Sequence, residues 1–369
     1  GGIGTVNSLH QWRKQCRDTL SAAVLEVGRD PSLDDTLRRG LALLPPIRWQ
    51  PGSLVCIKPN LTTGKSAEGS AITTPRDVVA AVIDEINRST DGTCDIAIVE
   101  SDSDGRIEAN FEALGYVELV RRWNNVRLVD LGKEKFYKVI LPDWCKARMI
   151  EVPEILLQMD HFVNVANLKR HIQERITCCW KNLYGLPSDH LVRMRYHQYL
   201  CPLLVDLNYL FWPDLAVIDA RVGLGGTGPM SGYPVEFGQL IVSANPLAAD
   251  MAAMRAIGES HRRVPSLRHA ARRLRVGDCD LQVVGDPVVP KPLPFVPNPV
   301  FWAVRIGLSL RKVATLFENL SLLTWLVGIA LRMGKPTDFA GGGVQSLGTS
   351  LKVAWRFFRT VDLSEKVYE

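Results

Sequence analysis

Four apolar runs of this sequence each lead into polar or glycine-rich residues whose types could do chemistry. In chain order, the runs lead into Lys58 and Asn60, Glu100 and Asp102, Lys169 and His171, and Asp219 with the glycine-rich stretch 223–232. In open α/β sheets, ligands bind in the crevice beyond the carboxyl ends of the strands. If the four runs are parallel strands, the sequence predicts one binding site at their shared edge.

Cationic side chains dominate the residues predicted at this edge. Lys58, Lys169 and Lys181 can each hold a carboxylate or phosphate as a point charge, which predicts a small anionic ligand. Imidazole titrates near neutral pH, so His171 is the first candidate for a catalytic acid or base, followed by Lys169. The predicted ligand-binding residues are Lys58, Asn60, Lys181, Asn182, Asp219, Gly226 and Gly228.

Structural roles remain open for several of these residues. His171 could be hydrogen-bonded within a loop, and Lys181 with Asn182 could cap a helix or bridge strands. Lys169 and His171 are expected in a polar loop after a strand. Replacing either with Ala should then abolish function and cost less stability than the roughly 2–5 kcal/mol of a large core truncation.

The carboxylates of the stretch Glu-Ser-Asp-Ser-Asp-Gly, residues 100–105, resemble the first half of a calcium loop. Position twelve of such a loop would be Phe111 instead of Glu, and the segment follows a strand instead of a helix, so a calcium hand is not expected. A divalent metal held by Glu100 and Asp102 is one hypothesis, and solvated loop carboxylates are the other.

The segment Gly-Leu-Gly-Gly-Thr-Gly, residues 223–228, satisfies the G-x-G-x-x-G pattern of dinucleotide-binding proteins. That pattern binds pyrophosphate only where a helix begins inside it. Here Pro229 and Gly232 follow, and the chain reads as a loop, which argues against NAD. The cofactor, if there is one, is left unknown.

Elements that would position these residues alternate between short strands and helices. The expected strands are Ser53–Lys58, Cys94–Glu100, Val126–Leu131, His161–Asn167, Leu215–Ala220 and Gln239–Ala244. Helices are expected to start at Thr74, as the cap before Pro75, and at Asn245 before Pro246. Repeated strand-then-helix units predict a doubly wound, mostly parallel α/β sheet with flanking helices.

The domain organisation has four expected parts. Residues 1–48 are expected to be a helical segment, 50–286 the α/β core, 287–299 a proline-rich connector, and 300–369 an apolar and basic helical extension. The apolar stretch 313–331 contains Glu318 and Asn319, so an interfacial or buried helix is favoured over a membrane span. A homodimer contact or a membrane surface is ranked above docking on the chain's own core.

Composition narrows the function classes. The 369 residues are 46% hydrophobic and 22% charged, which excludes bulk disorder, and the net charge of +5 is too mild to predict a nucleic-acid partner. Eight cysteines form no C-x-x-C, which favours a reduced, cytoplasmic protein that could associate with a membrane. An arginine-rich helix is expected between Gly258 and Asp278, its basic face either solvated or bound to an anionic membrane or acidic partner.

Residues 54–286 resemble the Domain of Unknown Function 362 family. The segments that carry the resemblance are VCIKPNL (55–61), TTPRDVVAAVI (73–83), IVESDSDG followed by FEALGY (111–116), NLKRH (167–171), TCCWKNLYG (177–185), VIDARVGLGGTGPMSGYP (217–234) and SANPLAAD (243–250). The resemblance implies an α/β fold. It also matches Lys58 and Asn60 to a K-P-N motif, Lys169 and His171 to K-x-H, and Lys181 with Asn182 to K-N.

Many members of that family carry a ferredoxin-like cluster module, which hints at redox chemistry. This chain lacks Cys-x-x-Cys-x-x-Cys, so a ferredoxin-type iron–sulfur site is not expected. Two hypotheses follow. One is an enzyme acting on a small anion at the sheet edge, by a redox reaction and with help from a metal or cofactor. The other is a non-catalytic binding or assembly protein that its C-terminal helices dock to a membrane or a partner subunit.

Overall fold

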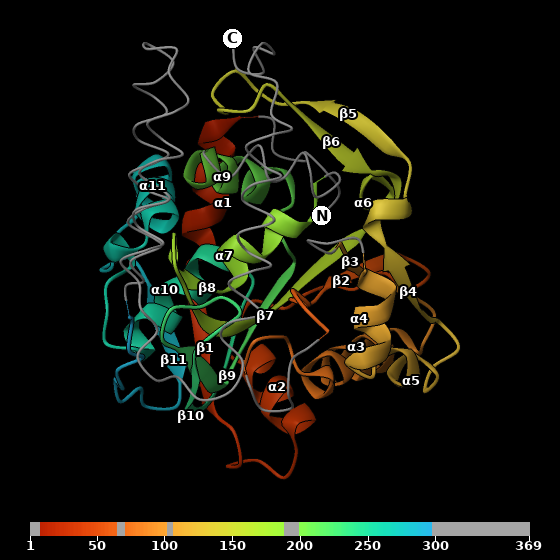
Figure 1. Cartoon of the computed structure of the whole chain (residues 1–369), viewed down its shortest axis with the longest axis horizontal. Helices are drawn as coiled ribbons and strands as arrows, with labels where there is room; N and C mark the ends of the chain where they lie inside the picture. The colour runs from red at the N-terminus through yellow and green to blue at the C-terminus, as the bar shows by residue number, and fades with distance from the viewer. Residues whose placement is uncertain (1–7, 65–70, 102–105, 188–198, 297–369) are drawn as a thin grey trace, which may run out of the picture. The chain divides into compact units, whose positions relative to one another are not determined.

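The computed structural model describes residues 8–64, 71–101, 106–187 and 199–296. In these residues a nine-stranded mixed sheet has the order β11-β1-β10-β9-β7-β2-β3-β4, with β8 paired to β7 (Figure 1). The strands β9, β7, β2, β3 and β4 run parallel to one another, whereas β10 is antiparallel to both of its neighbours. A mostly parallel sheet with helices on its faces confirms the predicted α/β class.

The strands of this sheet are β1 (Ser21–Glu26), β2 (Leu54–Lys58), β3 (Asp95–Glu100), β4 (Val126–Asp130), β7 (His161–His171), β8 (Arg175–Thr177), β9 (Leu215–Gly225), β10 (Tyr233–Ser243) and β11 (Gln282–Gly285). A separate hairpin consists of β5 (Phe136–Ile140) and β6 (Met149–Pro153). The helices are α1 (Leu9–Asp18), α2 (Leu33–Ala42), α3 (Arg76–Thr90), α4 (Ile107–Ala113), α5 (Tyr116–Val120), α6 (Glu154–Gln158), α7 (Cys179–Asn182), α9 (Leu200–Leu210), α10 (Pro246–Ala256) and α11 (Pro265–Leu274).

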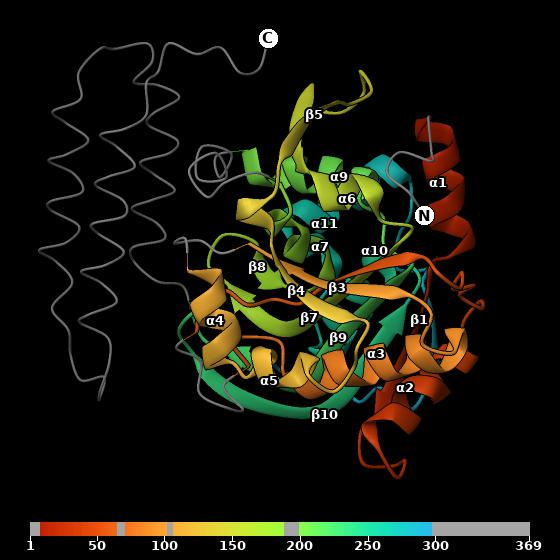
Figure 2. The ribbon, with the colours of Figure 1, turned by 90° about the vertical axis from the view of Figure 1, so that its right-hand side faces the viewer.

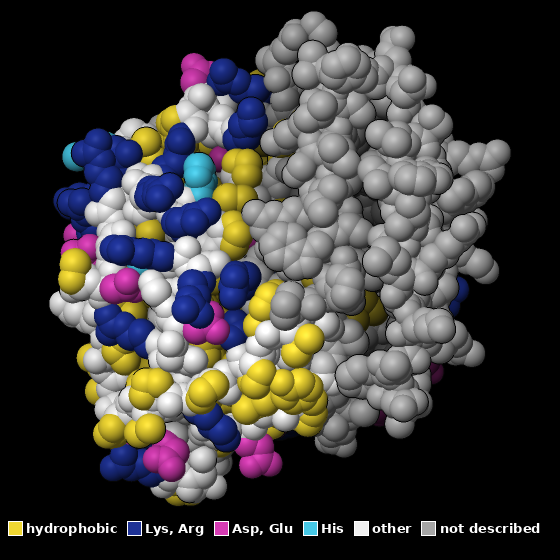
Figure 3. Space-filling model, turned by 60° about the vertical axis from the view of Figure 1, so that its left-hand side comes forward, with side chains coloured by type: hydrophobic (Ala, Val, Ile, Leu, Met, Phe, Trp, Pro, Cys, Tyr) yellow, Lys and Arg dark blue, Asp and Glu magenta, His cyan; other side chains and the backbone are white. Residues whose placement is uncertain are grey.

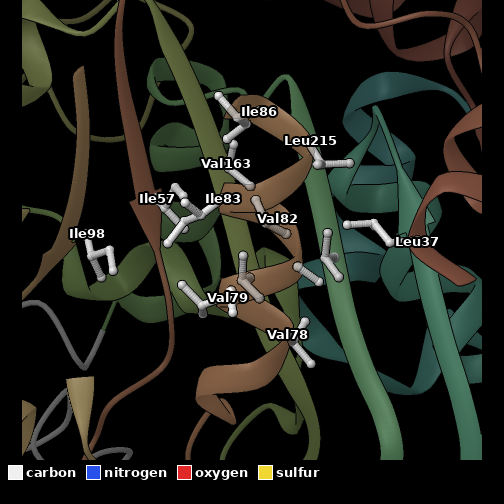
Figure 4. Packing of buried hydrophobic residues seen from close by; sticks show 14 of the residues in the cluster. Leu37, Ile57, Val78, Val79, Val82, Ile83, Ile86, Ile98, Val163 and Leu215 are labelled. Atoms are coloured by element: carbon white, nitrogen blue, oxygen red, sulfur yellow. The ribbon is translucent and has the colours of Figure 1, made fainter. Parts of the chain in front are cut away.

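Helices cover the sheet on both faces, as Figure 2 shows: α2, α3 and α5 lie on one side and α7, α10 and α11 on the other. On the first side, α3 buries Val78, Val79, Val82 and Ile83 against strand residues that include Ile57 (Figure 4). These α3 residues recur at helical spacing, so they form one apolar face that fits the apolar surface of the sheet. Both faces of the central strands are therefore shielded from water.

The segment Ser21–Glu26 forms strand β1, where the sequence predicted helix throughout residues 1–48. The run Ala22-Ala23-Val24-Leu25 suits either structure locally, because short apolar runs do not distinguish a buried strand from a helix. Tertiary pairing decides: β1 is held between β10 and β11, and the residues 22–25 are buried. The flanking α1 and α2 are helical as expected.

Three strands, β7, β9 and β10, extend further than predicted. The strand β7 continues to His171, so Lys169 and His171 lie in a strand and not in a polar loop. Its extension is held by antiparallel pairing with β8, which includes Lys169 opposite Thr177. Because all eleven residues of β7 are buried, replacing Lys169 acts on the core as well as on a site.

Of the two predicted helix caps, the structure confirms Asn245 and not Thr74. Asn245 caps α10 as expected, since its side-chain oxygen accepts from the backbone N–H groups of Leu247 and Ala248. Thr74 is not the cap of α3. Its hydroxyl accepts from Asn60 N at 2.8 Å and donates to Val165 O at 3.1 Å, so it joins the segment after β2 to the middle of β7 instead.

The predicted extension 300–369, and with it the homodimer or membrane contact, lies outside the described residues, which end at Val296 and include residues 287–296 of the predicted connector. Among the helices that the structure describes, none has the length and apolar character required to cross a bilayer.

Candidate functional site

The candidate site lies where the strand order of the sheet reverses. From β2 the chain crosses to β3 and β4 on one side, then returns to β7 on the other side of β2 and continues to β9. The carboxyl ends of β2 and β7 therefore diverge at a topological switch point, which is where open α/β sheets bind ligands. Lys58 and Asn60 come from the end of β2, and Lys169 comes from the end of β7.

Lys58 and Glu100 form a buried ion pair across the ends of β2 and β3. The Lys58 Nζ to Glu100 Oε1 distance is 2.5 Å, and the two side chains are only 2% and 4% exposed. The second Glu100 oxygen accepts from Leu61 N at 2.9 Å, and Oε1 also accepts from Ser101 N at 2.9 Å. Gly185 packs directly on this pair, since a Cβ there would stand 3.1 Å from Lys58 Nζ.

These contacts give Glu100 another role, and the predicted metal site at Glu100 and Asp102 stays a prediction. Both oxygens of Glu100 are used by Lys58 and by backbone N–H groups, so Glu100 neutralises a lysine. Asp102 lies outside the described residues. Within the described ranges, no three His, Cys, Asp or Glu side chains are grouped so that they could hold a metal ion.

Lys169 is fully buried, and its contacts among the described residues are neutral oxygen atoms. Its ammonium donates to Asn60 Oδ1 at 2.6 Å and to Ile72 O at 2.8 Å, and Thr62 Oγ1 is 3.5 Å away. No carboxylate among the described residues forms an ion pair with it. Burial, together with the nearby charges of Lys181 and Lys58, lowers the pKa of Lys169 to about 7 against the opposing effect of Glu100.

A chain of buried asparagines connects Lys169 to the rest of the site. Asn60 receives the Lys169 bond and donates to Asn182 Oδ1 at 2.8 Å. Asn182 in turn donates to Asn164 Oδ1 at 2.8 Å, and Asn164 donates to Cys179 O at 2.8 Å. In this chain each amide accepts a hydrogen bond through its oxygen and donates the next through its nitrogen. The amides therefore orient one another and hold the lysine in place.

Lys181 lies beside this network, on the short helix α7. Burial lowers the pKa of Lys181 to about 8; the charge of Glu174 opposes the shift and that of Lys58 adds to it. Glu174 is itself buried, accepts from Ser266 N at 2.9 Å, and has a pKa raised by burial. The structure therefore brings together Lys58, Lys169 and Lys181, as the sequence predicted.

His171 accepts two hydrogen bonds at one ring nitrogen. Its Nδ1 receives the backbone N–H groups of Gln173 at 3.1 Å and Glu174 at 3.0 Å. In a neutral imidazole whose Nδ1 accepts, the proton is on Nε2 and that nitrogen is a donor. Action as a base would require these two bonds to break. A catalytic role for His171 stays a prediction, and the geometry restricts it to donation from Nε2.

The predicted ligand residue Asp219 is engaged with an arginine. Its carboxylate accepts from Arg221 Nε at 3.0 Å and from Arg221 Nη2 at 2.9 Å. The same guanidinium binds Asp77 on α3 at 2.6 and 2.8 Å, and Arg221 thereby lowers the pKa of Asp77 against the effect of burial. Through these ion pairs Arg221 joins β9 to α3, and Asp219 has a structural role in holding Arg221.

The glycine-rich segment forms the turn between β9 and β10, and β10 follows it where a dinucleotide site would need a helix. Gly226 exchanges backbone hydrogen bonds with Pro294 and Val296, at 2.9 and 3.1 Å. Gly228 has φ of +48°, and a Cβ there would clash with Arg170 O. Both glycines permit close backbone approach, so their predicted ligand contacts gain no support from this geometry.

Two buried polar residues of the site were missed from the sequence. Asn164 interrupts the apolar run of β7, and Asp250 interrupts the apolar helix α10. Asp250 accepts from Cys179 N at 2.8 Å and Trp180 N at 3.1 Å, and burial raises its pKa to about 8. A lone polar residue inside an otherwise apolar element was the signal that could have indicated both.

Together these features define an α/β protein with a cationic, amide-lined site at the switch point of its sheet. The chain belongs to the family described as a domain of unknown function, DUF362, whose model matches residues 55–255. It is 27% identical over 207 residues to a thylakoid-associated protein of Synechocystis sp.. That match covers 54% of this chain and 62% of the relative.

A solved structure with detectable similarity is the lactate racemase apoprotein from Thermoanaerobacterium thermosaccharolyticum. The TM-score is 0.42 and the identity 13%, over 64% of this chain and 57% of that chain. A similarity of this size is too weak to carry a functional assignment.

Proposed function

We propose that this protein is an enzyme that binds a small carboxylate or phosphate anion at the carboxyl edge of its sheet, against Lys58, Lys169 and Lys181. The main observation that supports this proposal is that buried positive charge there exceeds the negative charge paired with it. Three lysines meet there; among the described residues Glu100 forms an ion pair with Lys58 and Glu174 acts on Lys181 through its charge, which leaves Lys169 with neutral acceptors. Buried charges are normally paired, so an anion is the ligand chemistry that would complete the site.

Unsatisfied polar atoms next to Lys169 support the same placement. Thr177, directly opposite Lys169 in the β7–β8 pair, has a buried hydroxyl without a hydrogen-bond partner among the described residues. The side-chain oxygen of Asn167, two residues before Lys169, is likewise buried and unpartnered there. A bound molecule that both donates and accepts hydrogen bonds would satisfy these atoms.

Lys169 is the residue to which we assign proton transfer. A catalytic acid or base works best when its pKa lies near the working pH, and burial has brought the pKa of Lys169 to about 7. The chain of asparagines fixes the position of the Lys169 ammonium. In the proposed step the proton therefore moves while the side chain stays in place. The resemblance to a family with cluster modules makes a redox reaction the first reaction class to test.

The experiment compares Lys169→Gln with Lys138→Gln, an exposed lysine on β5 that provides the same change in charge. Melting temperatures of the full chain are measured with acetate, citrate, inorganic phosphate and glycerol phosphate. One or more of these anions should stabilise the unmodified chain and the Lys138 variant, and the Lys169 variant should lose that shift. Equal shifts in all three proteins would place the anion elsewhere.

Elemental analysis, absorbance spectra and mass spectrometry of material released on denaturation test whether a metal or chromophore takes part. If the protein contains no bound group and none of the anions changes its melting, the proposed site is wrong. The alternative is then a non-catalytic assembly protein. The thylakoid association in the relative's name supports membrane docking for that alternative, and pelleting of the full chain with vesicles would test it.

A further inference from the structure

A second cationic region lies on the surface, over the helix α11 and the 3-10 turn His261–Arg263 before it. Figure 3 shows Lys and Arg side chains gathered on the face turned forward from the α11 side of Figure 1. A hollow of about 300 Å³ lies in this region. Its lining consists of His261, Arg262, Arg268, Ala271, Arg272, Arg275 and Val276.

Local structure directs these arginines to one place. The helix α11 begins at Pro265. Arg268 and Arg272 are four residues apart within it and therefore lie on the same side of the helix. The chain then turns at Arg275, which has φ of +59° and follows the last helical residue. Arg17 of α1 donates to Arg275 O at 2.9 Å and so adds a further guanidinium beside the turn.

The arginines of this hollow differ from most others on the described surface. Several exposed arginines elsewhere pair with a carboxylate, as Arg88 does with Glu85 and Arg121 with Glu118, both at 2.7 Å. Within the described ranges, the four arginines of the hollow form no ion pair, and no carboxylate belongs to its lining. The local potential is therefore strongly positive.

Neighbouring groups respond to this potential. Arg13 of α1 lies close by, since its Nε donates to Arg273 O at 2.8 Å. The charges of Arg275 and Arg273 add to desolvation in lowering the pKa of Arg13. In the same way Arg273 and Arg272 add to the burial that lowers the pKa of His269.

Two carboxylates stand near the hollow: Asp278 contacts His261 Nδ1 at 2.6 Å, and Glu259 lies 3.7 Å from Arg263. Neither forms an ion pair with Arg262, Arg268, Arg272 or Arg275, so in the described part of the chain these four arginines leave an excess of positive charge.

We propose that this hollow is a second anion site, which binds a phosphate group with two or more negative charges, on a soluble molecule or a lipid headgroup. Guanidinium groups present planar, paired N–H donors that match phosphate oxygens, and several can share one phosphate. The walls from Ala271 and Val276 limit the space and provide an apolar contact for the group that bears the phosphate. None of these residues belongs to the lysine site at the sheet edge.

The test uses the full chain with tripolyphosphate, measured by calorimetry at low salt. The variant is Arg268→Gln with Arg272→Gln, and the matched control is Arg88→Gln with Arg121→Gln, which removes the same charge from paired positions. The first variant should bind at least tenfold more weakly, and the control should bind like the unmodified chain. Lys169→Gln should keep the binding that the Arg268/Arg272 variant loses, which separates this site from the proposed catalytic one.

Vesicles distinguish the two sources of phosphate. Binding to phosphatidic acid vesicles in a phosphatidylcholine background, lost in the Arg268/Arg272 variant, would support a lipid headgroup. Binding of tripolyphosphate alone would support a soluble ligand. Absence of both kinds of binding, or equal loss in the Arg88/Arg121 control, would overturn the proposal.

Discussion

The sheet edge and the α11 face both concentrate cations, but they manage the charge differently. At the edge, Lys58 has a buried carboxylate and Lys169 has a set of neutral acceptors, and burial lowers the pKa of Lys169 to about 7. On the α11 face, Arg268 and Arg272 are exposed and stay in contact with water. Water solvates the second group at little cost, whereas the first depends on the protein for its solvation.

This difference has a practical consequence. Each polar partner at the sheet edge contributes to the fold, so function and stability are coupled there. The α11 face contributes charge but little stability, so its arginines can be replaced without loss of the fold. Four predictions test this contrast, in order of decreasing effect.

Glu100→Gln should have the largest effect. It leaves the ammonium of Lys58 buried without its counter-ion, and breaking a buried pair in this way costs about 3–5 kcal/mol. The control is Glu118→Gln in an exposed pair, where both side chains are more than two-thirds exposed and the change should stay below about 1 kcal/mol. Urea unfolding of both variants makes the comparison. Similar losses would mean that the Lys58 pair is solvated.

Asp250→Asn should lower stability in a way that depends on pH. An amide offers one acceptor for two backbone N–H groups, so at pH 5 the loss should be about 1–3 kcal/mol. The pKa of Asp250 is about 8 in the folded chain and about 3.9 in an unfolded one. The folded state thus keeps a proton that the unfolded state releases, and this contribution to stability is lost as the pH rises from about 4 to 8.

The deficit of the Asp250 variant should therefore shrink between pH 5 and pH 8. Denaturant titrations at the two pH values measure it, and Asp143→Asn on the surface should show no such trend. A constant deficit would indicate that the carboxyl is already ionised at pH 5.

Anion binding at the sheet edge should weaken at alkaline pH. The ligand binds the protonated lysine, so affinity should be constant below pH 7 and fall by up to about tenfold per pH unit above it. An unfolded lysine stays protonated to about pH 10.4, so burial of Lys169 costs stability below pH 7 and that cost decreases as the pH rises toward 10. Titrations with the anion that stabilises the chain, between pH 6 and 9, give the slope. A flat profile would exclude Lys169 as the titrating group.

Replacing Arg268 and Arg272 with Gln should leave stability within about 0.5 kcal/mol of the unmodified chain. The two like charges repel at this helical spacing, whereas Arg272 gains from its place near the carboxyl end of α11, so the effects nearly cancel. Thermal unfolding measures the change. A loss of several kcal/mol would show that these arginines are part of the packing and not a free surface.

Much of the core could be predicted from the sequence. Apolar content and spacing were enough to predict two strands and one helix, Leu54–Lys58, Asp95–Glu100 and Arg76–Thr90. Strands that are buried on both faces have nearly continuous apolar sequences. The prediction was wrong for Ser21–Glu26, because its four apolar residues fit a helix and a strand equally. Pairing with the neighbouring β10 and β11 selects the strand.

The residue types at the sheet edge were also readable from the sequence. A lysine or asparagine directly after a buried strand indicates a site, and Lys58, Asn60 and Lys169 do lie together. Many of their partners were not readable, because donor and acceptor lie far apart in the sequence. Leu61 and Glu100 are 39 residues apart, and Asn60 and Asn182 are 122 residues apart.

The sequence by itself determined the composition of the site: many cations, few carboxylates, and the strands that carry them to one edge. The tertiary structure decided what each residue does there. It assigned Glu100 to Lys58, Asp219 to Arg221, and the asparagines to Lys169. The physical reason is that a charge or hydrogen bond depends on distance in space and on burial, and both are set only when separate segments pack together.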